Sequence, residues 1–382
     1  MRFQQMNLIH QRKQSNKIPL YITSVIASIL LIALVVAPQY SMIGAKNGLL
    51  LCGEILIPSF FPFLVFAGFL IESGLPKMVG KLFDPLFKLL FKLPGSTASA
   101  FIVGILAGYP VGAKFVAGLY QKGLLTKSEA ERSLCFCVNS GAGFIIGAVG
   151  AGILHSVSAG ILLFTAHISA SLLIAFGSRF QSKKAGCGAT PPVMAQNKSI
   201  SEKFVFSVID AGHTMLNICA FVILFSALTS ILAGCQLIPA LAQTLGGLFG
   251  GVGLTAHTFE SLLTGLLEVT NGCAIAGALP NMQTVVLIAA LLGWSGLCVH
   301  CQVASAIAET DLSAKPYFLS RFVHAPLSVI LAVFLFNLFP QCIPTFTEQS
   351  ITPQVAFNSA PASIALLVLI SMLLLSNQNQ KV

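Results

Sequence analysis

Two ionisable side chains could take part in chemistry because they lie close to or within long apolar runs. Lys114 follows the string Gly108-Tyr109-Pro110-Val111-Gly112, and Glu268 lies in Gly265-Leu-Leu-Glu-Val-Thr-Asn-Gly272. A charged side chain at the centre of a membrane-spanning helix costs roughly 2.5–3.5 kcal/mol on insertion scales. Such residues usually face a cavity or a partner. We therefore expect these two to recognise a solute.

Lys114 and the residues before it predict a site for an anion. A helix that begins near Gly112 would point its free backbone N–H groups toward the membrane midplane, where a lysine adds to their attraction for negative charge. Tyr109 and Pro110 belong to the same tip. The alternatives are that Lys114 extends to the membrane surface or that it pairs with Glu268.

The second tip offers hydrogen-bond donors and acceptors to a solute. Thr270 and Asn271 follow Glu268 directly, and the three side chains would share one turn of chain. A carboxylate in an apolar run usually faces a cavity or a proton path. The alternative is a buried network with a purely structural role.

Further polar residues mark points where predicted membrane helices are interrupted. Asn139 and Ser140 precede a glycine, and so does Ser295, so each could present a polar group at membrane depth. They could equally satisfy backbone groups that the breaks leave free. His300 and Gln302 lie just over one turn beyond the second break, and a lone histidine there is also compatible with a structural role.

The composition places these residues in a membrane protein. Of the 382 residues, 55% are hydrophobic and 9% are charged, whereas soluble domains carry about 25% charged residues. A spanning helix needs about 20 apolar residues. Windows of that length or longer contain no Asp, Glu, Lys or Arg; they are residues 20–45, 93–113, 133–178, 211–259 and 269–308. The chain is predicted to be an all-α polytopic membrane protein.

The apolar pattern predicts about eight crossings, two re-entrant helical hairpins and one helix in the membrane plane. The hairpins are 97–121 and 256–281, and the in-plane helix is 75–94, where lysines and one aspartate form a polar stripe opposite leucine and phenylalanine. A polar linker spans 179–205. The crossings are 19–38, 48–72, a third interrupted at 139–141, 157–178, 213–234, 282–304, 322–340 and 360–376. Pro58 and Pro62 are expected to break the second crossing, and Thr126 and Glu129 form a capping-box pattern that starts the helix of the third.

The basic residues support this layout. With the N-terminus inside, 19 of the 21 Lys and Arg fall in cytoplasmic segments, among them 315–321, while Lys46 falls outside and Lys114 within the membrane. A full crossing at 97–121 would destroy that bias, so the positive-inside rule favours a hairpin. The same distribution explains the net charge of +9 without nucleic acid as a partner.

Weak internal similarity predicts an inverted structural repeat. Gly112 and Gly272 are 160 residues apart, and Ser140 and Ser295 are 155 residues apart in the same order. Three crossings separate the copies, so the copies would face opposite ways, as in many secondary transporters. The predicted parts are a basic N-terminus with the first helix, two repeats, a linker between them and the last helices (1–47, 48–178, 206–310, 179–205 and 311–382).

Motifs of soluble catalysis are missing from the sequence. It contains no hydrolytic triad pattern, Walker loop, dinucleotide fingerprint or metalloprotease motif. Cys298 and Cys301 have metal-ligand spacing but no second pair at zinc-ribbon distance. We expect neither enzyme activity nor a metal or cofactor.

Several strings together resemble a known family. They are Pro58-Ser-Phe-Phe-Pro-Phe, Leu106-Ala-Gly-Tyr-Pro-Val-Gly-Ala-Lys114, Lys127-Ser-Glu-Ala-Glu-Arg132, the second tip, and Gly296-Leu-Cys-Val-His-Cys-Gln-Val-Ala304. The chain resembles, over roughly 48–335, the sporulation integral membrane protein YlbJ family of the nucleoside-recognition Gate superfamily, which is similar to concentrative nucleoside transporters. One departure is the absence of a proline after Asn139 and Ser140.

The resemblance implies a role in a spore-forming bacterium. It implies uptake of dipicolinate from the mother cell into the space around the forespore, with the outer forespore membrane as the expected location. Dipicolinate is an aromatic dianion, which suits Lys114, and Tyr109 could stack on its ring.

Three functions remain open on the sequence. The first is a secondary transporter of a small anionic solute, which the two ionisable tips favour. The second is a nucleoside-type transporter, and the third is a membrane scaffold for spore maturation that transports nothing. The bilayer and a small anion are the expected partners. The sequence leaves open whether a proton or another cation is coupled, and whether the chain forms a homo-oligomer.

Overall fold

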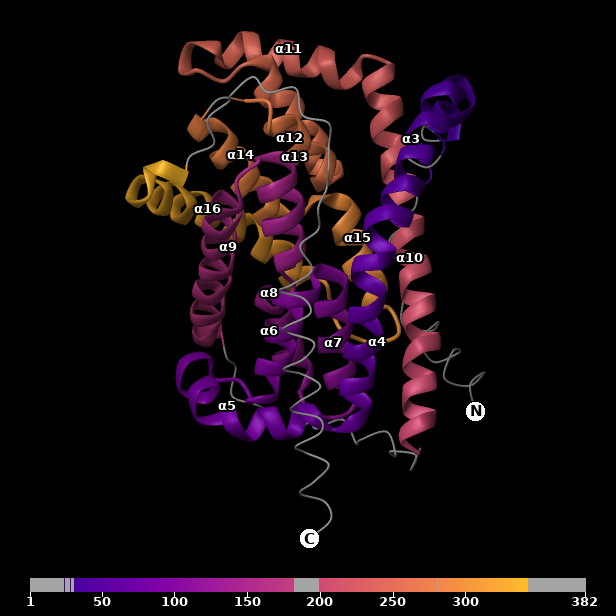
Figure 1. Ribbon diagram of the computed structural model, residues 1–382, viewed down its shortest axis with the longest axis vertical. Helices are drawn as coiled ribbons and strands as arrows, with labels where there is room; N and C mark the ends of the chain where they lie inside the picture. The colour runs from indigo at the N-terminus through magenta and orange to yellow at the C-terminus, as the bar shows by residue number, and fades with distance from the viewer. Residues whose placement is uncertain (1–23, 25–27, 29–30, 182–198, 280, 343–382) are drawn as a thin grey trace.

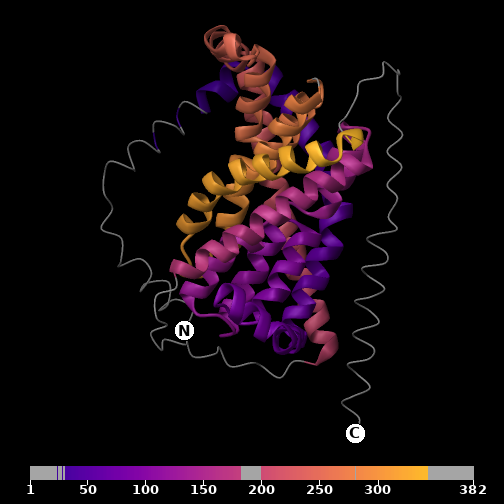
Figure 2. The same cartoon turned by 90° about the vertical axis from the view of Figure 1, so that its left-hand side faces the viewer.

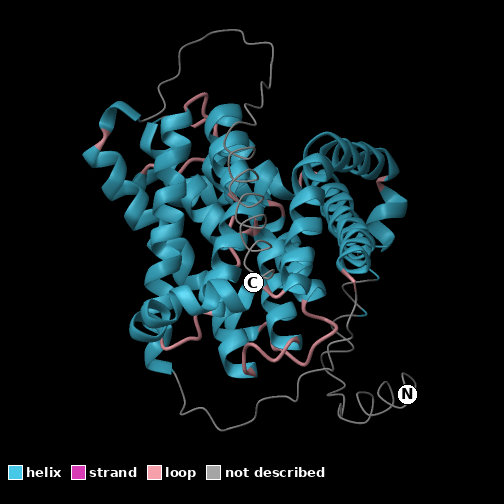
Figure 3. Ribbon diagram, turned by 60° about the horizontal axis from the view of Figure 1, so that its bottom comes forward, coloured by secondary structure: helices cyan, strands magenta, loops and turns pink. Residues whose placement is uncertain are grey.

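The computed structural model describes residues 24, 28, 31–181, 199–279 and 281–342, and within these ranges every regular element is a helix (Figure 3). Four described helices are long and apolar enough to cross a membrane, and a bent pair would add a fifth. They are Val157–Ser178, Ile200–Gly234, Met282–Ala306 and Lys315–Leu338, with the pair Phe60–Ser73 and Pro76–Phe91. The all-α membrane class is confirmed. The full set of eight crossings stays a prediction, because 360–376 and most of 19–38 lie outside the described residues.

The described helices follow one order twice: a long helix, a short amphipathic helix, a helical hairpin, a broken helix and a second long helix. The first series is α3 (Pro38–Leu51) continued through π-helical Cys52–Leu56 into α4 (Ile57–Ser73), then α5 (Leu75–Phe91), α6 (Ser96–Ala107), α7 (Tyr109–Gln121), α8 (Lys127–Cys137) with π-helical Gly143–Ile153, and α9 (Val157–Ser178). The second is α10 (Ile200–Gly234), α11 (Leu237–Phe249), α12 (Ala256–Leu267), α13 (Val269–Ala276), α14 (Asn281–Trp294) with α15 (Gly296–Ala306), and α16 (Lys315–Leu338).

The two series point in opposite directions. In Figure 1 the amphipathic helix of the first series, α5, lies along the bottom of the molecule, and its counterpart α11 lies along the top. The last helix of the second series, α16, crosses obliquely over the bundle (Figure 2). The arrangement matches the predicted inverted repeat, and it extends the correspondence to helices that the sequence comparison did not pair.

The in-plane helix predicted at 75–94 is α5, and it has three distinct faces. One face packs on the bundle through Gly80, Phe87 and Phe91. The other two are exposed: a basic stripe (Lys77, Lys81 and Lys88) and an apolar stripe (Met78, Leu82, Leu86 and Leu89). Helix α5 is bent by 84° from the preceding span. A helix with adjacent basic and apolar exposed faces suits the boundary between headgroups and acyl chains.

Both predicted hairpins exist as antiparallel helix pairs. Ser96 at the start of α6 donates a hydrogen bond to the Leu124 carbonyl beyond the end of α7, at 3.4 Å, so the ends of the first hairpin meet. In the second, the Ser261 hydroxyl of α12 donates to the Gly272 carbonyl of α13 at 2.9 Å. The arms approach closely because glycines face the contact: a Cβ on Gly112 of α7 would lie 3.1 Å from the Gly104 Cα of α6, and one on Gly272 of α13 would lie 2.3 Å from the Gly265 Cα of α12. Re-entry into a bilayer stays a prediction.

Several predicted boundaries need correction. Helix α10 begins at Ile200, 13 residues before the predicted crossing at 213, because Ser199 and Glu202 form a capping box that shortens the linker. Helix α16 begins at Lys315 instead of 322. The prolines of the second crossing do not break it, because Pro58 lies in the first turn of α4 and Pro62 is accommodated within it. The predicted capping box of Thr126 and Glu129 at the start of α8 is confirmed.

Candidate functional site

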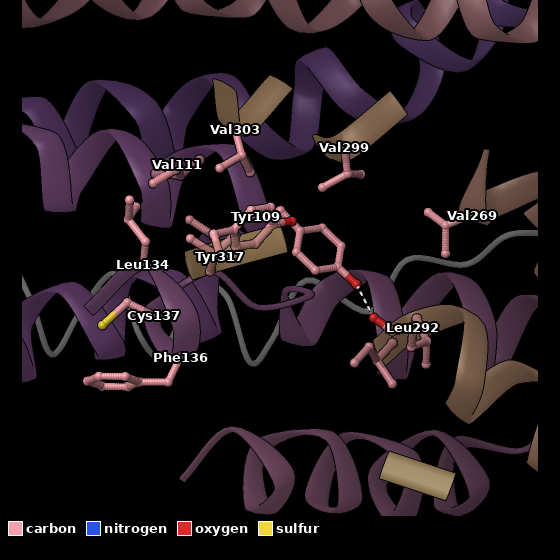
Figure 4. Close-up of a cluster of buried hydrophobic side chains, with 14 of the residues drawn as sticks. Tyr109, Val111, Leu134, Phe136, Cys137, Val269, Leu292, Val299, Val303 and Tyr317 are labelled. Atoms are coloured by element: carbon pink, nitrogen blue, oxygen red, sulfur yellow. Dashed lines mark hydrogen bonds between the residues drawn. The ribbon is translucent and has the colours of Figure 1, made fainter. Parts of the chain in front are cut away.

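The breaks of the two series meet in the middle of the molecule. The first hairpin tip packs on the first broken helix, since the backbone of Gly141 lies against Gly108. The second tip packs likewise on Gly296, whose backbone lies against Val269. Tyr109 joins the halves, because its hydroxyl donates to the Leu292 carbonyl at 2.7 Å (Figure 4). The interruptions predicted at the two hairpin tips, at 139–141 and at 295–296 are therefore confirmed.

The first break is held by buried hydrogen bonds. Asn139 donates from its side-chain nitrogen to the Phe136 carbonyl at 2.6 Å and accepts from the Ser171 hydroxyl at 2.8 Å. These contacts are the ones expected of the structural alternative considered from the sequence. The backbone N–H of Ser140 donates to His167 Nε2 at 3.2 Å, but the buried Ser140 hydroxyl has no partner among the described residues.

A buried arginine lies beside this break, and the sequence analysis missed it. Arg321 is fully buried, and its guanidinium donates to the Val138 carbonyl at 3.2 Å, to the Cys135 carbonyl and to the Ser320 hydroxyl. No carboxylate of the described chain lies within ion-pair distance of it. Its assignment to the loop 315–321 is wrong, because α16 begins at Lys315 and carries Arg321 into the bundle.

Two histidines lie where the repeats meet. His167 of α9 and His324 of α16 occupy corresponding helices, their ring centroids are 4.4 Å apart, and His324 Nε2 lies 3.0 Å from the His167 carbonyl oxygen. Neither Nδ1 atom has a partner in the described chain, nor does the buried Tyr317 hydroxyl, whose ring lies 4.9 Å from the Arg321 guanidinium carbon. We call Arg321 with Tyr109, Ser140, His167, Ser295, Tyr317 and His324 the polar centre. Buried polar groups without partners are rare and usually bind water or a ligand.

A cavity of about 280 Å³ opens between α4, α7, α10 and α15. Three predicted site residues line it: Pro110, Lys114 and Gln302. Its wall also carries three phenylalanines, Phe115 of α7 and Phe206 and Phe221 of α10. Four polar side chains of α10 line it as well: Asp210, His213, Thr214 and Asn217. The predicted residues Tyr109, Gly112, Asn139, Ser140, Glu268, Thr270, Asn271, Ser295 and His300 are not part of the wall.

Lys114 has a partner that the sequence did not suggest. Its Nζ lies 2.8 Å from Asp210 Oδ2 and also contacts the Thr214 hydroxyl. The alternative pairing with Glu268 is therefore wrong. Asp210 and Thr214 are one helical turn apart on α10, at the same depth as the start of α7. In the sequence, a carboxylate one turn before a threonine is a weak signal. The crossing was predicted to start at 213, so Asp210 fell between the linker and the predicted membrane helix.

Glu268 has a structural role at the second tip. Its carboxylate is buried and accepts hydrogen bonds from the backbone N–H groups of Thr270 at 3.0 Å and Asn271 at 2.8 Å, which caps the N-terminus of α13. Thr270 and Asn271 thus contribute their backbones to this network. The observation favours the structural alternative for Glu268.

The remaining candidates lie at or beyond the second break, and Gln302 is the one among them that lines the cavity. His300 Nε2 lies 2.7 Å from the Trp294 carbonyl oxygen, and its ring packs against the Trp294 ring, so it ties α15 to the end of α14. Gln302 lines the cavity and donates to Cys298 Sγ at 3.4 Å. Ser295 has a positive φ of 80°, which marks the break itself.

Comparisons with known proteins agree with this architecture. A family model described as nucleoside recognition, Gate, matches residues 55–196. The chain is 30% identical to the sporulation integral membrane protein YlbJ of Bacillus subtilis (strain 168) over 346 residues, which is 85% of this chain and 83% of that protein. No solved structure matches the chain. At this identity and coverage, the chain belongs to the YlbJ family of sporulation integral membrane proteins.

Proposed function

We propose that the protein is a secondary transporter of a small anionic solute and that the cavity beside Lys114 is its binding site. The observation that carries the proposal is the meeting of helix breaks from two inverted repeats, with the helix start at the first break reaching the cavity wall at Pro110. Inverted repeats with broken helices at corresponding positions are the common architecture of secondary transporters. A scaffold would have no physical need for an open, charged cavity at this depth.

Lys114 is the group on the cavity wall that we propose binds an anion, once its partner Asp210 is displaced. Arg321 does not line the cavity, but it is a buried guanidinium without a carboxylate partner in the described chain. The N-terminus of α7 begins at Tyr109 with no side-chain cap, and Pro110 and Val111 bring it to the cavity wall. A substrate carboxylate would compete with Asp210 for Lys114. Free helix N-termini and cations both stabilise carboxylates.

Dipicolinate is the anion that we propose, in line with the family resemblance. It has an aromatic ring between two carboxylates, and the cavity wall supplies Phe206 and Phe221 for a ring and Lys114 for a carboxylate. Tyr109 is not available for stacking, because it is buried and bonded to the Leu292 carbonyl. The expected location is the outer forespore membrane of a spore former. The match to a nucleoside-recognition model keeps a nucleoside as the second candidate.

Uptake into proteoliposomes tests the proposal. Purified protein is reconstituted, and uptake of labelled dipicolinate is compared with that of labelled uridine and adenosine. We expect saturable dipicolinate uptake, loss of most of it in Lys114→Met, and partial retention in Lys114→Arg, which keeps the charge but changes its geometry. Lys46→Met is the matched control, because Lys46 lies on α3 and does not line the cavity.

Each alternative outcome has a distinct meaning. Uptake of nucleosides with no uptake of dipicolinate would favour the nucleoside-type transporter. Absence of uptake of every solute by inserted, monodisperse protein would favour the scaffold. Equal dipicolinate uptake by wild type and Lys114→Met would show that Lys114 does not bind the anion.

A further inference from the structure

The lysine proposed to bind substrate is already neutralised in this structure. Lys114 Nζ lies 2.8 Å from Asp210 Oδ2 and 3.4 Å from the Asp210 carbonyl oxygen. The two side chains are 28% and 37% exposed, so water and a solute in the cavity both reach them. An incoming carboxylate must therefore displace Asp210 before it can contact the ammonium group.

The cavity as a whole holds more carboxylates than lysines. Lys122 pairs with Glu72 at 2.7 Å, while Glu309 lines the cavity without an ion pair to any described residue, and His213 completes the titratable groups on the wall. A dianion would therefore meet no net positive charge while Asp210 and Glu309 stay ionised. Like charges at contact distance repel by at least about 1 kcal/mol even in bulk water and by more in a membrane cavity.

Other charged groups on helices packed against α10 lie away from Asp210. Glu54 and Lys46 belong to α3 and the π-helical segment that follows it, which pack along the later part of α10. There Cys52 Sγ contacts the Cys219 carbonyl, and Gly44 lies against Ser226. His257 and Glu260 of α12 pair with each other outside the cavity wall. Besides Lys203, which lies two turns before Asp210 on α10, the charged groups around Asp210 are therefore those of the cavity wall.

We infer that Asp210 is the proton-coupling residue of the proposed transporter, binding a proton while Lys114 holds a substrate carboxylate. The inference rests on the proposed function. A proton on Asp210 removes a like charge beside the arriving anion, and it frees Lys114 without leaving a carboxylate ionised and unpaired. When the substrate leaves, Asp210 loses this proton to water in the cavity and pairs with Lys114 again. One proton thus accompanies each anion at this residue.

Gradient-driven uptake tests the inference. Proteoliposomes with the membrane potential held at zero receive a pH gradient, acidic on the side of uptake, at pH values where dipicolinate is fully ionised. One coupled proton predicts about tenfold accumulation of dipicolinate per pH unit, because one unit is a tenfold proton ratio. Asp210→Asn should abolish this dependence while retaining exchange of internal for external dipicolinate, and Asp210→Glu should keep it.

A matched control removes a different ion pair by the same substitution. Asp84→Asn breaks the pair of Asp84 with Lys88 on α5, outside the cavity, and should leave the gradient dependence at the wild-type value. Proton uptake by wild type provides a measurement that needs no variant: adding ionised dipicolinate to weakly buffered purified protein should make the solution more alkaline.

The outcomes separate this inference from the proposed function. Wild-type uptake without any response to the pH gradient, or binding without proton uptake, would overturn proton coupling and leave anion transport standing. Gradient dependence that survives in Asp210→Asn but disappears in Glu309→Gln would overturn the assignment to Asp210. Failure of wild type to transport any anion would refute the proposed function itself.

Discussion

Replacing Glu268 by Gln should destabilise the second hairpin tip, and the structure gives the size of the effect. The two carboxylate oxygens accept separate backbone N–H bonds from Thr270 and Asn271. Glutamine offers one oxygen, so one buried N–H loses its partner, which costs about 1–3 kcal/mol. Loss of the negative charge at the N-terminus of α13 adds roughly 0.3–1 kcal/mol. The easier burial of a neutral amide offsets part of this, leaving about 1–3 kcal/mol.

Glu268→Asp separates capping from other roles, because aspartate is itself a preferred N-cap residue that keeps both the charge and two oxygens. Thermal unfolding in detergent, followed with a thiol-reactive dye that reports exposure of buried Cys273 nearby, should show a lower midpoint for the Gln variant and a near-normal one for Asp. Equal midpoints for wild type and Glu268→Gln would refute the capping argument. A stable Gln variant without transport would instead return Glu268 to a direct role in the solute path.

Two further predictions concern the surface and the interface between the repeats. With the protein expressed in the plasma membrane of cells that do not sporulate, and in a background without other cysteines, a membrane-impermeant thiol reagent added outside should label Gln243→Cys on α11 and miss Lys81→Cys on α5. Labelling of both would contradict the inverted arrangement. The hydroxyl of Tyr120 and then the ammonium of Lys127 hold the pKa of Asp311 below its ordinary value. The stabilisation by Asp311 is therefore present above the ordinary carboxyl pKa and is lost as pH falls through the lowered pKa. Asp311→Asn should lower the free energy of unfolding near neutrality by at most about 1 kcal/mol, because the pair is so exposed. The difference from wild type should vanish in acid. A pH-independent difference would contradict this assignment.

Local signals in the sequence predicted the helix interruptions well. The strings at 108–112, 139–141, 268–272 and 295–296 each mark a point where the helical backbone changes direction, and the structure has a break at each, whereas Pro58 and Pro62 do not break their helix. The amphipathic stripe of α5 was readable for the same reason, because helical periodicity alone defines it. The helix starts at Ile200 and Lys315 were missed, because hydropathy identifies the apolar stretch and is blind to polar first turns.

Pairings between distant segments could not be predicted in this way. The pair of Lys114 with Asp210 joins residues 96 positions apart and depends on how α7 packs beside α10. Arg321 shows the same limit: it counted as a loop residue by composition, but the oblique path of α16 carries it to carbonyls released at the end of α8. The side of the membrane that each segment faces stays a prediction from the charge pattern, whereas the identity of each partner required the tertiary structure.

The two hairpin tips have similar backbones, but the helices that follow them differ in whether a side chain caps their free backbone N–H groups. This difference bears on function. Helix α13 begins with its own carboxylate, Glu268, bound to its free N–H groups. Helix α7 begins at the corresponding break without a side-chain cap, and its first turn reaches the cavity wall at Pro110. The protein thus supplies an internal carboxylate cap in one repeat and no side-chain cap in the other. Since the second repeat shows that this kind of helix start can hold a carboxylate, we propose that the uncapped start of α7 helps to bind a carboxylate of the substrate.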